Sequence, residues 1–172
     1  MDLFVAQGFE QTSVAQISEA ADIGKGTFFT YFATKQAVLS FLGEQVMAVM
    51  AAADDSGQSA IARLRSVFAA AGGWFDAHEA AARQMCVARI TTFGQAEVAS
   101  SQPALVELLA GIVGDGMAAG EFRRVDSQAA AVLLLVSAYV APVVQWTWSA
   151  PGTALAPSLL GQLDLALAAL VA

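Results

Sequence analysis

The segment from Gly8 to Leu39 constrains the fold of this chain more than any other part of its sequence. It reads GFEQTSVAQISEAADIGKGTFFTYFATKQAVL. Gly8 is expected to end a short first helix. A second helix is expected to begin at Ser13, because Gln16 follows three residues later at the spacing of a capping box. This helix should end near Asp22.

Two further helix starts follow in the same segment. A short helix is expected from about Gly24 to Tyr31, and three apolar side chains around it are expected to be buried: Ile23, Phe28 and Phe32. Thr34 is placed to cap a long helix that begins at Lys35. Two short helices around a tight turn form a helix-turn-helix. Apolar residues recur at spacings of three and four along the whole chain, so the predicted fold class is all-α.

The first turn of the second short helix has residue types that suit contact with a DNA groove. Gly24 and Gly26 let the backbone approach, while Lys25 and Thr27 offer hydrogen-bond donors. Lys35, at the start of the next helix, could bind a flanking phosphate. Ordinary helical proteins also contain turns with Gly and Lys, so spacing alone leaves both interpretations open.

The residues themselves are more specific than their spacing, and they resemble the DNA-binding region of TetR-like (tetracycline-repressor-like) transcriptional regulators. The resemblance covers residues 3–42 and includes LF at 3–4, GF at 8–9, TSV at 12–14, KGTFFTYF at 25–32 and TK at 34–35. It implies a helix-turn-helix DNA-binding domain at residues 1–46. Residues 47–172 would then form a helical ligand-binding and dimerisation domain, in which AGEFRRVD at 119–126 resembles the entry into the dimer helices.

The resemblance implies a ligand-responsive regulator, expected to be a repressor. A homodimer would bind double-stranded palindromic operator DNA, with its two recognition helices in major grooves about 34–36 Å apart. A small apolar effector would shift the long helix that begins at Lys35 and cause release. The DNA contacts carried over by position are Thr12 or Ser13, together with Lys25, Gly26, Thr27, Tyr31 and Lys35.

Two departures from the family pattern bear on DNA affinity. Phe29 stands where a tyrosine hydroxyl often meets a phosphate, and losing one neutral hydrogen bond weakens binding by about 0.5–1.5 kcal/mol. Family members usually carry a longer first helix preceded by a basic arm, so we expect the natural chain to begin upstream of Met1. The alternative is a relative with a shortened N-terminus that dimerises or binds small molecules without binding DNA.

Charge and composition narrow the partners that this chain can have. The formal net charge is −7, and residues 1–50 hold only Lys25 and Lys35 as cations, so DNA binding cannot rest on bulk charge. Hydrophobic residues make up 57% of the chain, and a membrane, a partner subunit or an apolar ligand could cover the surplus.

A membrane is the weakest of these three candidates. The longest apolar run, residues 129–144, is interrupted by Ser137 and Pro142 and is shorter than the about 20 residues that a spanning helix needs. The N-terminus lacks a secretory-signal pattern, and Cys86 as a single cysteine cannot form an internal disulfide. These features predict a cytoplasmic protein.

Two C-terminal segments are the expected dimer interface. Residues 127–145 are apolar on nearly every side, and a helix of that kind must be covered all round. Residues 157–171 are amphipathic, with a broad stripe of Leu159, Leu160, Leu163, Leu167, Leu170 and Val171. Two such helices from each subunit would form a four-helix interface around a two-fold axis. The alternative is a core within a single chain.

The middle of the chain is the expected place for an effector pocket. Its candidate residues recur at helical intervals: Phe68, Trp74, Phe75, His78, Met85, Cys86, Arg89 and Phe93. Aromatic stripes are more often plain core, so His78 and Arg89 are the most suggestive members, because polar groups in an apolar cavity orient a ligand. His78 could equally be a surface residue near a helix end.

The sequence gives little support to catalysis. On one continuous helix His78 and Cys86 would be about 12 Å apart, too far for a thiolate–imidazole pair. One histidine and one cysteine also exclude the usual zinc clusters. The segment from Gly114 to Gly120 has neither the spacing nor the preceding strand of a phosphate-binding loop. We therefore expect no enzyme activity, no metal and no cofactor.

Overall fold

The computed structural model describes residues 3, 7–9, 11–91, 102–122 and 127–171. Every regular element in these residues is an α-helix, and Phe122 and Val171 form an isolated bridge, so the all-α prediction is confirmed. The helices are α2 (Val14–Ala20), α3 (Lys25–Tyr31), α4 (Lys35–Ala52), α5 (Ala60–Ala77), α6 (Glu79–Thr91), α7 (Gln102–Ala118), α8 (Gln128–Thr147) and α9 (Ala156–Leu170).

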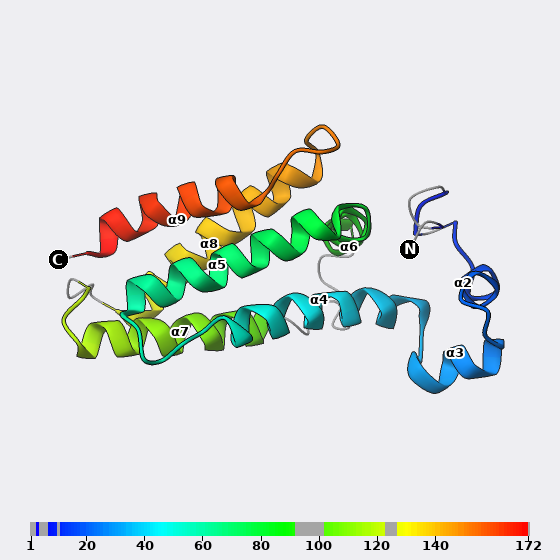
Figure 1. Cartoon of the computed structure of the whole chain (residues 1–172), viewed down its shortest axis with the longest axis horizontal. Helices are drawn as coiled ribbons and strands as arrows, with labels where there is room; N and C mark the ends of the chain where they lie inside the picture. The colour runs from blue at the N-terminus through cyan, green and yellow to red at the C-terminus, as the bar shows by residue number, and fades with distance from the viewer. Residues whose placement is uncertain (1–2, 4–6, 10, 92–101, 123–126, 172) are drawn as a thin grey trace.

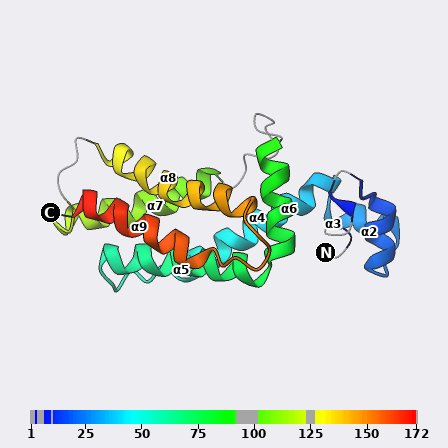
Figure 2. The same ribbon diagram turned by 90° about the horizontal axis from the view of Figure 1, so that it is seen from above.

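The long helix α4 joins two parts of the molecule (Figure 1). Its N-terminal end carries α2 and α3, which lie apart from the rest. Its C-terminal end packs against α5 and α7, which form a bundle with α8 and α9. Helix α6 runs across the bundle at its end nearest α2 and α3, where it contacts α4, α5 and α8 (Figure 2). The predicted domain boundary between residues 46 and 47 falls inside α4, which continues through it without a break.

The caps read from the sequence set the helix starts in the N-terminal part. Ser13 Oγ accepts from the Gln16 backbone N–H at 3.3 Å, and Gln16 Oε1 accepts from the Ser13 backbone N–H at 2.9 Å. Thr34 caps α4 by accepting from the backbone N–H of Ala37. Asp22 has a φ of 52°, so the turn between α2 and α3 passes through the left-handed region.

The expectation that Ile23 is buried is wrong. Its side chain is 38% exposed, whereas Phe28 is 1% exposed and Phe32 is half-buried. Phe32 packs on Phe28, with ring centroids 5.5 Å apart, and on Phe41 of α4. This ring cluster anchors α3 to α4, and Ile23 lies outside it because the turn after Asp22 carries it toward solvent.

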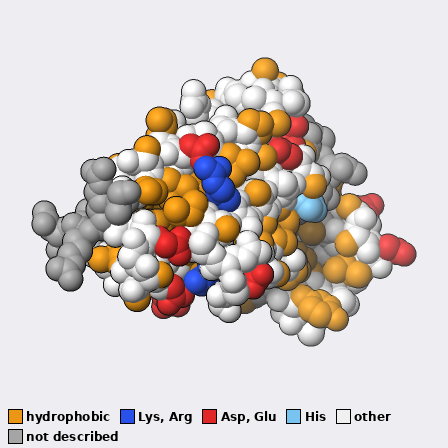
Figure 3. Space-filling model, turned by 60° about the vertical axis from the view of Figure 1, so that its left-hand side comes forward, with side chains coloured by type: hydrophobic (Ala, Val, Ile, Leu, Met, Phe, Trp, Pro, Cys, Tyr) orange, Lys and Arg blue, Asp and Glu red, His pale blue; other side chains and the backbone are white. Residues whose placement is uncertain are grey.

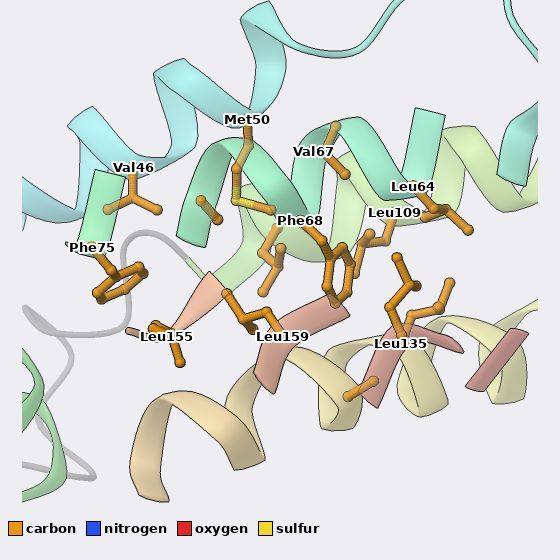
Figure 4. Packing of buried hydrophobic residues seen from close by; sticks show 14 of the residues in the cluster. Val46, Met50, Leu64, Val67, Phe68, Phe75, Leu109, Leu135, Leu155 and Leu159 are labelled. Atoms are coloured by element: carbon orange, nitrogen blue, oxygen red, sulfur yellow. The ribbon is translucent and has the colours of Figure 1, made fainter. Parts of the chain in front are cut away.

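The core of the bundle is centred on α5, whose fully buried side chains pack against several neighbouring helices. Phe68 lies between side chains of α7, α8 and α9 (Figure 4). Where α5 meets α9, a Cβ atom on Gly72 would lie 2.6 Å from Cα of Ala156, so the helices approach closely because this residue is glycine.

Charged side chains hold the ends of several helices. Arg63 of α5 binds Asp54, which follows α4, and Asp115 of α7. Arg83 of α6 donates to the backbone oxygens of Trp146, Thr147, Ser149 and Ala150 at the end of α8. Asp76 accepts from the backbone N–H groups of Leu155 and Ala156, where α9 begins.

The two predicted interface segments correspond to α8 and α9, and both contribute to the core of this chain. Most of the predicted leucine stripe of α9 is buried against α5 and α8: Leu159, Leu163, Leu167 and Leu170. Helix α8 is long and apolar enough to span a membrane by length and composition alone. It packs against α7 and α9 as a core helix does.

Candidate functional site

The first candidate site is the exposed surface of α3. Lys25, Gly26 and Thr27 form its first turn and are all exposed, and Tyr31 at its last turn is 76% exposed. Phe29 is 54% exposed, with its ring edge-on to the buried Phe28. The structure therefore places four of the predicted contact residues on one short helix that projects from the bundle (Figure 1).

Gly26 is not required by the packing of the protein itself. A Cβ atom there would meet nothing within 4 Å, and its φ lies outside the left-handed region. A glycine inside a helix lowers helix stability by roughly 0.8–1.0 kcal/mol relative to alanine. What the glycine does provide is a backbone that an external surface can approach closely.

Thr12 and Ser13, the alternative phosphate contacts, lie in different environments. Thr12 is 1% exposed, and its hydroxyl donates to the backbone oxygen of Gly8 at 2.7 Å. Ser13 is exposed at the start of α2, where its hydroxyl belongs to the capping box. Ser13 is therefore the member of the pair that remains a predicted contact, because Thr12 does not present its hydroxyl to solvent.

Lys35 is held by an interaction that the sequence did not indicate. Its Nζ donates to the backbone oxygen of Phe9 at 2.8 Å and lies 4.4 Å from the centroid of the Phe9 ring. This lysine therefore ties the start of α4 to the segment before α2. The other N-terminal lysine, Lys25, is exposed on α3.

The predicted pocket residues fall into two separate groups. Trp74, Phe75 and His78 lie at the C-terminal end of α5, where Phe75 also packs edge-on against Trp146. His78 is exposed, stacks on Trp74 with centroids 4.7 Å apart, and has Nδ1 2.9 Å from the backbone oxygen of Trp74. It is thus the surface residue at a helix end that the sequence left as an alternative.

The second group lies between α5, α6 and α8. Phe68 and Met85 are buried, and Arg89 is half-buried near the end of α6. Phe68 packs edge-on against Tyr139 of α8, with centroids 5.8 Å apart. His78 and Arg89 lie at opposite ends of α6, about 16 Å apart along its axis. They do not converge. Phe93, the remaining predicted member, lies outside the described residues.

Burial dominates the electrostatics of this second group. It raises the pKa of Cys86 to about 11, so the thiol is neutral at pH 7. It also raises the pKa of Tyr139 above its ordinary value and lowers that of Arg89. Nη2 of Arg89 is buried with no hydrogen-bond partner among the described residues.

One residue of this second group had no signal in the sequence. Tyr139 belongs to a helix that composition assigned to the dimer interface. The described residues contain no group of three or more His, Cys, Asp or Glu side chains that could hold a metal ion.

Comparison with known sequences connects the N-terminal part to one family. The profile of the family described as "Bacterial regulatory proteins, tetR family" matches residues 1–40. The HTH-type transcriptional regulator TcmR of Streptomyces glaucescens is 50% identical over 38 residues, which are 22% of this chain and 17% of that protein. The match thus spans less than a fifth of the length of this curated relative.

Comparison with solved structures extends over the whole fold. The fatty acid degradation regulator FadR from Bacillus halodurans has a TM-score of 0.81 at 17% identity, covering 96% of this chain and 92% of that one. FadR from Bacillus subtilis in complex with stearoyl-CoA has 0.77 at 17%, covering 98% and 94%. FadR from Thermus thermophilus in complex with lauroyl-CoA has 0.67 at 25%, covering 100% and 91%.

Proposed function

We propose, since this chain belongs to the tetR family of bacterial regulatory proteins, that it binds a palindromic operator as a homodimer and that a small apolar ligand releases it, as a repressor acts. The observation that carries the proposal is the exposed first turn of α3. There a glycine without a packing role stands between a lysine and a threonine that offer donors to DNA.

The geometry of α3 supports a role as the recognition helix. It is short, it projects from the bundle, and α4 connects it directly to the helices that would respond to a ligand (Figure 1). A dimer would bring two copies of α3 to successive major grooves of an operator. Few cations lie near α3, so specific affinity would depend on close backbone approach and base contacts more than on counterion release.

Replacing Gly26 by alanine is expected to lower affinity for operator DNA at least tenfold while leaving the protein as stable or more so. The new methyl group meets open space in the protein but would stand between the α3 backbone and DNA. Helix propensity alone favours alanine by about 0.8–1.0 kcal/mol. Fluorescence anisotropy with DNA from upstream of the gene, with non-specific competitor and at two salt concentrations, measures the affinity.

Gly111→Ala is the matched control for this test. Gly111 lies in α7, and a Cβ there also meets nothing within 4 Å, so the substitution has the same helix effect far from α3. It should leave DNA binding unchanged. Equal affinities of the Gly26 variant and wild type would remove α3 from the interface.

A second candidate function follows from Lys35. Its ammonium group is bonded to the backbone of Phe9, which favours a relative that dimerises or binds small molecules without binding DNA. The test is to measure binding of the upstream DNA by wild type and by a version extended at the N-terminus. If neither protein binds, the function without DNA binding is favoured.

The surface of α8 supports dimerisation. Large apolar side chains stay exposed at helical spacing along it: Leu133 at 65%, Val140 at 42%, Val144 at 39% and Trp148, just past its end, at 66%. Leu165 of the adjacent α9 is 68% exposed. The face of the molecule drawn in Figure 3 shows apolar side chains in patches among polar and charged ones. A second copy of the chain that covers the α8 stripe would form the expected four-helix interface.

Replacing Leu133 by glutamate is expected to convert the dimer to a monomer at micromolar concentration. The carboxylate would be placed in an apolar interface twice, once from each subunit, because a two-fold contact repeats every substitution. Analytical ultracentrifugation across a concentration series measures the dissociation constant. Val106→Glu on α7, where the side chain is 43% exposed, is the control and should remain a dimer. A dimer of unchanged strength in the Leu133 variant would exclude this face.

Release would act through α4. This helix starts beside α3 and ends in the bundle, where Met50 is fully buried against the core. A ligand that binds one position of α4 better than another shifts the population of the two states by the difference in affinity. The acyl-CoA complexes of two structural neighbours support a ligand with an apolar body.

A further inference from the structure

Arg89 stands out among the arginines that the structure describes. Arg63, Arg65 and Arg83 each form a salt bridge with a carboxylate of the chain. Arg89 forms none with the described residues, and its Nη2 is buried without a hydrogen-bond partner among them. Nη2 has therefore lost its contact with water without gaining a hydrogen bond from the described part of the protein.

The surroundings of Arg89 are apolar on the side of the core. The ionisable groups that act on it are the Cys86 thiol and the Tyr139 phenol, both neutral at pH 7. Met85 lies one helical turn earlier on α6 and is 3% exposed, and Phe68 packs on the ring of Tyr139. The site therefore combines one positive charge with an aromatic and aliphatic wall from three helices.

We propose that Arg89 binds the carboxylate of an amphipathic monoanion whose apolar body lies along Phe68, Met85 and Tyr139. A planar guanidinium matches a carboxylate through two parallel hydrogen bonds, which would satisfy the buried Nη2. The apolar body would replace contacts within the core between α5, α6 and α8. This inference rests on the proposed function, because it names the chemical class of the effector.

The choice of a carboxylate follows from the charge count at the site. One unpaired guanidinium balances one negative charge, whereas a phosphomonoester would leave an excess of negative charge in an apolar place. A neutral ligand can accept a hydrogen bond from Nη2 through an oxygen atom, but it leaves the positive charge of the guanidinium unbalanced. Both alternatives are resolved by comparing ligands that share one apolar body and differ in the head group.

The test uses decanoate, 1-decanol and decyl phosphate as probes, measured by isothermal titration calorimetry on the dimer without DNA. Wild type is expected to bind decanoate at least tenfold more tightly than either other probe. Arg89→Gln should abolish this preference, because the amide keeps polarity and loses the charge. Arg65→Gln, which removes an exposed arginine, should keep it.

Thermal stability distinguishes an arginine that binds a ligand from one that stabilises the fold. Arg89→Met replaces the charge with an apolar side chain of similar length, so the ligand-free melting temperature should stay the same or rise. Decanoate should raise the melting temperature of wild type and not that of this variant. A lower ligand-free melting temperature in Arg89→Met would show that the charge stabilises the fold.

Other outcomes also overturn the inference. One is that wild type does not bind decanoate. Another is that wild type binds decanoate no more tightly than decanol, and a third is that Arg89→Gln binds decanoate as tightly as wild type does. The proposed function is tested separately, because these titrations contain no DNA. If the chain binds decanoate through Arg89 but binds no DNA, the ligand site is supported and the proposed repressor function is contradicted.

Discussion

Replacing Arg63 by alanine is expected to lower the free energy of unfolding by about 3 kcal/mol. Only 8% of its side chain is exposed, and its Nε and Nη1 lie 2.6 and 2.7 Å from oxygens of Asp54 and Asp115. Removing one member of a buried ion network leaves the others without compensation and opens a space in the packing. Asp115 is 67% exposed and can be hydrated, so the loss should come mainly from Asp54 and the packing.

Arg65 provides the matched control, because it lies two residues away on α5. It pairs with Asp164 at 2.7 Å, but both side chains are 50% exposed. An exposed pair of this kind contributes about 0–1 kcal/mol. Urea unfolding followed by circular dichroism compares the two alanine variants. If both lose the same small amount, the Arg63 network contributes no more than a surface pair.

The Arg63 network also matters for how a regulator of this shape could work. Asp54 follows the end of α4, and Asp115 lies on α7, so one guanidinium ties the helix that carries α3 to two helices of the bundle. This contact fixes the C-terminal end of α4. Any ligand-dependent movement of α4 is then expected to pivot about this end and to be largest at Lys35, next to α3.

The helix starts near the N-terminus could be predicted because their signals are local. Ser13 and Gln16 lie in one turn, and Thr34 acts on a backbone group three residues away. The bond from Lys35 to Phe9 links residues 26 positions apart, and no short pattern indicates it. The same limit explains the error at Ile23, since its exposure depends on where the turn between α2 and α3 points relative to the rest of the fold.

Which of the candidate pocket residues lie close together could be predicted only in part, for a related reason. Helical periodicity places side chains on one face of a helix, but it does not bring the two ends of that helix together. His78 and Arg89 therefore looked like a pair and lie at opposite ends of α6. Tyr139 lies near Arg89 but belongs to α8, 50 residues later in the chain, so their proximity could be found only from the tertiary fold.

The C-terminal helices show how one apolar pattern can serve two purposes. The leucine stripe of α9 was expected at a subunit interface, and the structure uses most of it in the core of the chain. The apolar surface left over lies on the other side of α8, at Leu133, Val140 and Val144. Composition could predict that some apolar surface would be left exposed, but only the packing of α8 on α7 and α9 identifies which residues form that surface.

Replacing Gly72 by leucine is expected to lower the free energy of unfolding by about 3 kcal/mol, at the upper end for overpacked cores. A Cβ there would lie 2.6 Å from Cα and 2.7 Å from Cβ of Ala156. Ala156 cannot easily move, because Asp76 holds its backbone N–H and, at 2.6 Å, that of Leu155. The new side chain must therefore separate α5 from α9.

Gly73→Leu supplies the control at the neighbouring position. Gly73 is exposed, and a Cβ there meets nothing within 4 Å. Leucine in place of glycine inside a helix should then stabilise the protein by up to about 1 kcal/mol. Both variants add the same side chain to the same helix, so the difference between them in urea unfolding measures the contact between α5 and α9. Equal stabilities would contradict that contact, and with it the burial of the leucine stripe of α9 in this chain rather than in a partner.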